Sequence, residues 1–120
     1  MSTPIEHLTD DTYAEAAERP GILVIDFWAG WCGPCRAMAP QFERAATLRP
    51  QYRFAKVDVD AEPAIAARYA IRSIPTLMVL RDGEPIAAQA GVVGAEQLID
   101  ALDRLAAEPS AAQAATGATV

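Results

Sequence analysis

Apolar side chains fill residues 22–28 almost without interruption, and Asp26 is the one charged residue among them. A run of this length that follows a glycine is typical of a strand buried on both faces of a sheet. An Asp-Gly pair at residues 82–83, between two apolar segments, predicts a hairpin turn. Alternating or apolar segments predict four further strands, at residues 5–8, 52–59, 76–80 and 85–90.

Helix signals separate most of these strands. We expect four helices, at residues 12–19, 32–48, 63–69 and 95–107. Thr9-Asp10-Asp11 offers a cap and acidic first-turn residues to the first helix. Pro34 suits the first turn of the second helix, whereas Pro40 lies inside that helix and predicts a kink. The order of elements predicts an α/β fold, in which a five-stranded mixed sheet is flanked by four helices on its two faces.

Composition and charge narrow the class of protein. The 120 residues fit one domain, and 52% of them are hydrophobic, which is ample for a core. A net charge of −6 argues against non-specific binding to nucleic acid, which requires a basic surface. No apolar run approaches the roughly 18 residues of a membrane-spanning helix, so we expect no membrane segment.

The two ends of the sequence differ from its middle. The first residues lack a basic segment followed by an apolar run, so they do not resemble a secretory signal, and the expected location is cytoplasmic. From Glu108 onward the chain is rich in alanine and has no large side chain before Val120. We therefore expect a folded domain over residues 1–107 and a flexible Ala-rich tail over residues 108–120.

The two cysteines of the chain lie in one motif, Trp31-Cys32-Gly33-Pro34-Cys35. If a helix starts at Cys32, its first N–H groups and positive dipole end favour a thiolate there, and a thiolate attacks disulfides. The motif therefore indicates a reversible dithiol/disulfide couple. A structural zinc site needs four ligands, and the chain offers two cysteines and the distant His7, so only a zinc site shared between chains remains as a metal alternative. A pair of inert core cysteines is the other alternative.

Several motifs together resemble the thioredoxin family. They are Phe27-Trp28-Ala29-Gly30-Trp31-Cys32-Gly33-Pro34-Cys35, the later Pro40, and Ile71-Arg72-Ser73-Ile74-Pro75-Thr76. The resemblance covers residues 4–107 and implies the thioredoxin fold and a thiol–disulfide oxidoreductase of the cytosolic bacterial type. It implies that Cys32 is the nucleophile and that Cys35, one turn into the helix and more buried, resolves the mixed disulfide. Ser73 and Ala90 depart from the family pattern, where we expect glycine and a branched apolar residue.

Asp26 lies within an apolar strand, where a carboxylate is costly unless it is paired or protonated. Burial should raise its pKa toward neutrality, which suits proton transfer to or from Cys35, and the resemblance puts Asp26 behind the active site. Lys56 is the only lysine beside nine arginines, and we expect its stem to lie near Asp26 and its charge to modulate that carboxyl. The alternatives are a purely structural buried pair of Asp26 with Lys56, and an exposed Lys56.

The resemblance also implies a substrate surface around the cysteines. It implies that Pro75 follows a cis peptide bond and faces the cysteines, which leaves the backbone of Ile74 free to pair with an extended substrate. Gly33 and Pro34 set the geometry of the motif, and proline withholds an N–H donor from the thiolate, which favours a reductant. The expected contact surface comprises Trp31, Gly33, Pro34, Ile74, Ala90 and Gly91.

Other interpretations of these residues remain open. Pro75 is alternatively an ordinary trans loop proline, and Gly91 alternatively serves only a turn. Trp28 packs beneath the motif or is simply part of the core. We expect His7 at the surface, too far from the cysteines to act as their base.

The resemblance implies protein partners instead of cofactors. We expect disulfide-containing proteins as substrates, and a flavoprotein thioredoxin reductase that supplies electrons from NADPH. We expect a monomer that itself binds no cofactor and no metal. Two other functions stay open: a binding module in which the thiols are dispensable, and an oxidase or isomerase, against which Gly33-Pro34 and the missing signal sequence argue.

Overall fold

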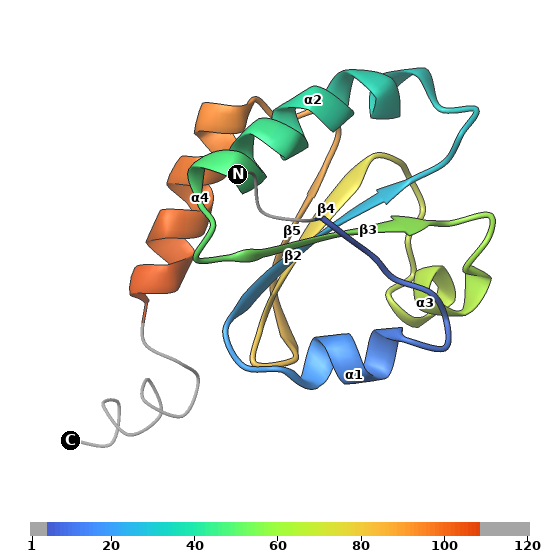
Figure 1. The fold of residues 1–120 in the computed structure, drawn as a ribbon. Coiled ribbons are helices and arrows are strands. Elements are labelled where there is room, and N and C mark those ends of the chain that lie inside the picture. The colour runs from blue at the N-terminus through green and yellow to red at the C-terminus, as the bar shows by residue number, and fades with distance from the viewer. Residues whose placement is uncertain (1–4, 109–120) are drawn as a thin grey trace.

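The computed structural model describes residues 5–108, so the expected tail lies, apart from Glu108, outside the described residues. The strands are β1 (Glu6–His7), β2 (Ile22–Trp28), β3 (Arg53–Asp58), β4 (Thr76–Arg81) and β5 (Glu84–Ala90). The helices are α1 (Tyr13–Glu18), α2 (Gly33–Leu48), α3 (Pro63–Arg68) and α4 (Ala95–Ala107). The expected order of elements and the expected α/β fold are confirmed (Figure 1).

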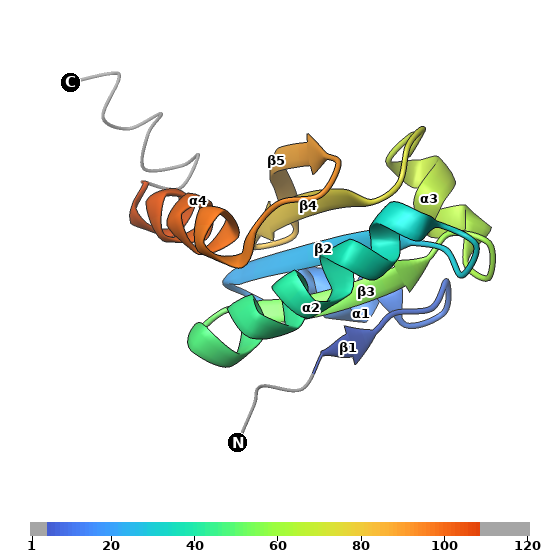
Figure 2. The same ribbon diagram turned by 90° about the horizontal axis from the view of Figure 1, so that it is seen from above.

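The five strands form one mixed sheet in the order β1-β3-β2-β4-β5. The central strand β2 runs parallel to β3 and antiparallel to β4, and β5 returns beside β4 as a hairpin. Helices α2 and α4 cover one face of the sheet, and α1 and α3 cover the other (Figures 1 and 2). This arrangement leaves the ends of β2 and β3 beside the start of α2, where the cysteine motif lies.

The apolar run of β2 is continuous because both of its faces are buried. Ile22 and Val24 pack in the core cluster under α2 and α4, whereas Leu23, Ile25 and Phe27 pack in the cluster under α1 and α3. Successive side chains of a strand point to opposite faces, so a central strand of a layered sheet needs apolar residues at almost every position. Asp26 interrupts this pattern on the α2 face and is fully buried there.

The hairpin between β4 and β5 follows from its turn residues. Asp82 and Gly83 both have positive φ, 51° and 89°, as the expected two-residue turn requires. Asp82 also accepts a hydrogen bond from the Gly21 N–H through Oδ1 at 2.7 Å. Pro85 lies on the edge strand, next to an irregularity in the register between Val79 and Leu80. A proline has no N–H to donate, so it is tolerated only where the ladder requires none, as at the start of an edge strand or at an irregularity.

The start of α1 differs in detail from the expectation: its N-cap residue is Thr12, which makes no side-chain capping hydrogen bond, and the Thr9 hydroxyl accepts the Thr12 N–H at 3.2 Å just before it. The Asp10 carboxylate has partners in another helix, since it accepts hydrogen bonds from the N–H groups of Ala64 at 3.3 Å and Ile65 at 3.0 Å. Those two groups belong to the first turn of α3, which tertiary packing brings beside Asp10. Ahead of α1, Thr9 and Thr12 hydrogen-bond each other reciprocally. Helix α2 continues without interruption through Pro40.

Candidate functional site

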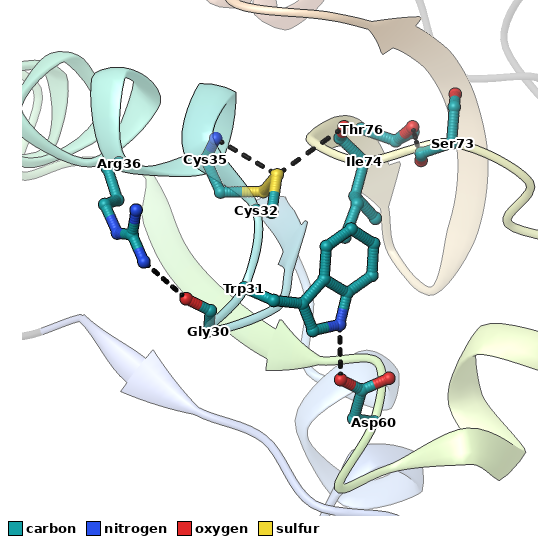
Figure 3. Close-up of a disulfide and its surroundings, with 9 residues drawn as sticks. All are labelled: Gly30, Trp31, Cys32, Cys35, Arg36, Asp60, Ser73, Ile74 and Thr76. Atoms are coloured by element: carbon teal, nitrogen blue, oxygen red, sulfur yellow. Dashed lines mark hydrogen bonds between the residues drawn. A yellow bond between two sulfur atoms is a disulfide. The ribbon is translucent and has the colours of Figure 1, made fainter.

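The cysteine pair lies at the N-terminus of α2. Cys32 is the N-cap residue, and Cys35 lies in the first turn with its Cα 5.3 Å from that of Cys32. The two are joined by a disulfide, and the Cys35 N–H donates to the Cys32 sulfur at 3.2 Å (Figure 3). Helix N-termini stabilise negative charge, so the Cys32 sulfur occupies a position that favours a thiolate once the disulfide is reduced.

The disulfide offers little surface of its own. Cys32 is 3% exposed and Cys35 is 5% exposed, so the expectation that Cys35 is the more buried of the two is wrong for this oxidised state. The reason is that the segment before Pro75 lies over Cys32, whose sulfur is 3.7 Å from the carbonyl oxygen of Ile74. Ala29 completes this small apolar cluster.

The segment opposite the cysteines, residues 73–76, contains a cis peptide bond and is held by hydrogen bonds. The Ile74–Pro75 peptide bond is cis, so the alternative of a trans proline does not apply. Pro75 is buried, and its carbonyl accepts a hydrogen bond from the Gly91 N–H at 2.8 Å. Thr76 donates from its hydroxyl to the Ser73 carbonyl at 2.6 Å. Gly91 has a φ of 92°, which a turn at the end of β5 uses.

The surface around the disulfide carries the expected apolar residues. The Trp31 side chain is 69% exposed, and its indole N–H donates to Oδ2 of Asp60 at 2.8 Å (Figure 3). Gly33, Pro34, Ala90 and Gly91 are exposed, and Ile74 is half-buried. A shallow pocket beside the disulfide brings together Trp31, Val59, Ile71, Arg72, Ser73 and Ile74.

Sequence analysis missed part of this surface. Val59, Asp60, Ile71 and Arg72 were not expected at the site, although Ile71 and Arg72 lie inside the motif that ends in Thr76. The pocket draws its members from the loops on either side of α3, and no local pattern links these segments to Trp31. A signal for Ile71 and Arg72 existed in their closeness to Pro75 in the sequence.

Asp26 lies fully buried on β2, and neither of its carboxylate oxygens has a hydrogen-bond partner within the described residues. Burial raises the pKa of Asp26 from 3.8 to about 6, and the positive charge of Lys56 partly opposes this rise. The expected direction of the pKa shift is therefore confirmed. A carboxyl with a pKa near neutrality can both take up and release a proton under physiological conditions.

Lys56 lies directly beside Asp26 in the register of β2 and β3. It is half-buried, and its ammonium lies over the Trp28 ring, 5.1 Å from the centroid. The expected closeness of Lys56 to the core is confirmed, and the alternative of a hydrogen-bonded buried pair with Asp26 is not formed. Trp28 itself packs against the cysteine cluster, as expected, and its indole N–H is buried without a partner among residues 5–108.

His7 lies exposed on the edge strand β1, as expected, and its register partner on β3 is Lys56. The part of the chain that the structure describes contains no group of three or more His, Cys, Asp or Glu side chains arranged to hold a metal ion. Within residues 5–108, no helix is both long enough and apolar enough to cross a membrane.

Comparisons with known proteins agree with this geometry. The family model described as Thioredoxin matches residues 4–104. A thioredoxin of Staphylococcus aureus is 41% identical over 101 residues, which cover 83% of this chain and 96% of that protein. A putative thioredoxin 2 of Streptomyces coelicolor is 38% identical over 102 residues, which cover 85% of this chain and 75% of that protein. A solved chain, from work on thiol resolution in a yeast mitochondrial 1-Cys peroxiredoxin via glutathione/thioredoxin systems, has a TM-score of 0.78 at 31% identity and covers 87% of this chain and 99% of its own.

Proposed function

The chain belongs to the thioredoxin family, whose members are protein-disulfide oxidoreductases, and from that premise we propose that it acts as a general protein-disulfide reductase. The observation that carries the proposal is the Cys32–Cys35 disulfide at the mouth of α2, with the Cys35 N–H directed at the Cys32 sulfur. A dithiol pair within one helical turn can give up two electrons and close to a disulfide without rearranging the fold.

The reaction begins with the reduced pair. The Cys32 thiolate attacks one sulfur of a substrate disulfide, so a Cys32–substrate disulfide forms and the other substrate sulfur leaves as a thiolate. The Cys35 thiolate then attacks the Cys32 sulfur, which closes the Cys32–Cys35 disulfide and releases the second substrate thiolate. The substrate gains two electrons and two protons, and the pair loses two of each.

Asp26 serves the second step in this mechanism. Cys35 must lose its proton before it attacks, and its own burial disfavours the thiolate. The Asp26 carboxylate accepts that proton, directly or through a water, because its pKa of about 6 keeps it ionised at neutral pH and still basic. Lys56 modulates this carboxyl through its positive charge.

The substrate approaches over the exposed apolar surface around the disulfide. A segment in extended conformation lies along the Ile74 backbone, in the manner of an added strand, and contacts Trp31 and Gly91. Gly33 and Pro34 leave the Cys32 side of this surface flat. Ala90 offers less contact than a larger residue, so backbone pairing carries more of the affinity here.

A separate flavoprotein, thioredoxin reductase, returns the pair to its dithiol form with electrons from NADPH. The chain binds no cofactor of its own in this scheme and works as a monomer in the cytoplasm. Its substrates are proteins with accessible disulfides. Residues 1–107 hold every group that this mechanism uses.

The test is NADPH oxidation in the presence of thioredoxin reductase and a disulfide-bonded protein, with and without this chain. Turnover that depends on the chain supports the reductase. Absence of turnover, with a Cys32–Cys35 pair that still cycles with small thiols, contradicts a general reductase and favours either a dedicated partner or the oxidising direction.

A variant separates the two thiols. Cys35→Ser should accumulate a disulfide-linked adduct with the substrate protein, visible on a non-reducing gel, because nothing resolves the first intermediate. Cys32→Ser is the matched control and should form no such adduct. If both variants form adducts equally, the assigned order of attack is wrong.

A further inference from the structure

On the α2 face of the sheet, the Lys56 ammonium lies near two side chains that can each attract it, Asp26 and Trp28. Asp26 and Trp28 are two positions apart on β2, so both point toward the α2 face. Lys56 is the register partner of Asp26 on the parallel neighbour β3 and points the same way. One ammonium therefore has a carboxylate and an indole ring within its reach, and the two compete for it.

The ammonium lies with the ring. Lys56 Nζ is 5.1 Å from the Trp28 centroid, inside the distance of about 6 Å at which a cation is attracted to an aromatic face. Both oxygens of Asp26 are left without a hydrogen-bond partner in the described part of the chain. A carboxylate that is fully buried beside a lysine and yet unpaired is unusual, because pairing is the common way to offset the cost of burial.

We propose that Trp28 is a positioning residue whose ring holds the Lys56 ammonium away from Asp26, so that the carboxylate stays unpaired and open to a proton. The elevated pKa of Asp26, about 6, agrees with this arrangement, since Lys56 opposes the effect of burial only in part. A hydrogen-bonded ammonium would lower that pKa by about one to three units and make Asp26 a poor base. The use of Asp26 as a base rests on the proposed function, whereas the competition for Lys56 does not.

Other charged and titratable groups face this site from the neighbouring elements. Asp58 lies on the same face of β3 and beside Trp28 in the register, and its Oδ1 accepts the N–H groups of Asp60 and Ala61. His7 lies beside Lys56 on β1 and is exposed. From α2, Cys35 belongs to the small cluster against which Trp28 packs, and it is tied in the disulfide. The β4 register partner of Asp26 is Leu77, which carries no charge.

The test measures the pKa of Asp26 by carboxyl carbon NMR in the oxidised protein, which needs neither substrate nor reductase. Four chains are compared: the native one, Trp28→Leu, Lys56→Met and the double variant. Trp28→Leu should lower the pKa of Asp26 by about one unit in the Lys56 chain, because the freed ammonium turns to the carboxylate. In the Lys56→Met chain the same substitution should leave the pKa of Asp26 unchanged.

A milder substitution at the same position keeps the proposal testable if Trp28→Leu fails to fold. Trp28→Phe keeps a smaller ring that holds a cation less strongly, so it should shift the pKa of Asp26 in the same direction by less, and again only when Lys56 is present. Trp31→Leu removes an indole that is bound to Asp60 and should leave the pKa of Asp26 unchanged.

Two results would overturn the proposal. An equal fall of the Asp26 pKa with and without Lys56 would mean that water enters the space left by the ring. No fall in the Lys56 chain, for either substitution of Trp28, would mean that the ring does not restrain the ammonium. Neither result bears on the reductase assay, so the positioning role of Trp28 and the reductase function fail independently.

Discussion

A carboxylate lies near each end of α2, Asp103 of α4 at the C-terminal end and Asp26 of β2 at the N-terminal end, and the two have opposite environments. At the C-terminal end, Asp103 accepts three hydrogen bonds from the Arg49 side chain, two from Nε at 3.0 Å and 3.2 Å and one from Nη2 at 2.9 Å, and a fourth from the Tyr52 hydroxyl at 2.7 Å. At the N-terminal end, Asp26 lies fully buried, and neither of its oxygens is hydrogen-bonded within residues 5–108. The more exposed carboxylate is thus the better satisfied of the two.

The pKa values follow the same division. Hydrogen bonds from Arg49 and then Tyr52 lower the pKa of Asp103, whereas burial raises that of Asp26 to about 6. A paired carboxylate is held in one charge state and joins α2 to α4. An unpaired buried one lowers the stability of the fold but changes its charge near neutral pH, which is what a proton carrier must do.

The largest expected effect is a loss of disulfide-reductase activity with no change in the fold. Cys32→Ser should abolish turnover in the NADPH-coupled assay, because it removes the thiol at the N-cap position that attacks the substrate disulfide. Its circular dichroism spectrum should match that of the native chain. Asp103→Asn is the control from the other end of α2 and should keep full turnover. Loss of turnover in both Cys32→Ser and Asp103→Asn would mean that catalysis also depends on the C-terminal end of α2.

Asp26→Asn should stabilise the protein at neutral pH. Its folded pKa is raised from 3.8 to about 6, so the folded chain binds more protons than the unfolded chain between these values, and stability falls as pH rises through that window. The full shift corresponds to about 3 kcal/mol. Denaturant unfolding should therefore show the variant more stable by about that amount at pH 7, with the advantage vanishing near pH 4. A gain that did not depend on pH would contradict the assignment.

Asp103→Ala should lower the Tm, because Arg49 and Tyr52 lose their shared acceptor. Since the folded pKa of Asp103 is lowered, its contribution is present above the pKa of the unfolded chain and disappears as pH falls through the folded value. Thermal melts of the variant and the native chain should differ at pH 7 and converge in acid. A Tm difference that grows in acid would reverse the comparison with Asp26.

The smallest expected effect comes from the ion pairs of Glu6. Arg19 and Arg53 both contact this carboxylate, at 2.7 Å and 3.1 Å, and Arg19 is largely exposed. Arg19→Ala should cost about 0.5 kcal/mol or less, and the difference should shrink in high salt. Urea unfolding at two salt concentrations measures this. A larger, salt-independent loss would mean that Arg19 contributes through packing.

The elements that follow from local patterns were predictable from the sequence. Residues 22–28 and 95–107 coincide with β2 and α4, because a doubly buried strand and an amphipathic helix each leave a pattern along the chain. The contact of Asp10 with α3 could not be predicted, since its partners there lie 54 and 55 residues away. A capping signal is local and carries no information on a helix so distant in the sequence.

At the site, too, features set by neighbouring residues could be predicted, whereas contacts between residues far apart in the sequence could not. The motif alone located the reactive cysteines, and the apolar run around Asp26 predicted a raised pKa. The contact of Lys56 with Trp28 could not be predicted, because register does not say toward which neighbour a long side chain leans. The relative burial of Cys32 was also misjudged, since the covering segment comes from residues near Ile74, far along the chain.

Lys56 is the only lysine of the chain, so it is also the only side-chain amine. A reagent that acylates amines therefore has a single side-chain target, and that target lies over Trp28 beside Asp26. Acylation removes the positive charge and with it the attraction to the ring. Labelling of a side-chain amine, which on most proteins marks a remote part of the surface, here attaches the label next to the redox centre.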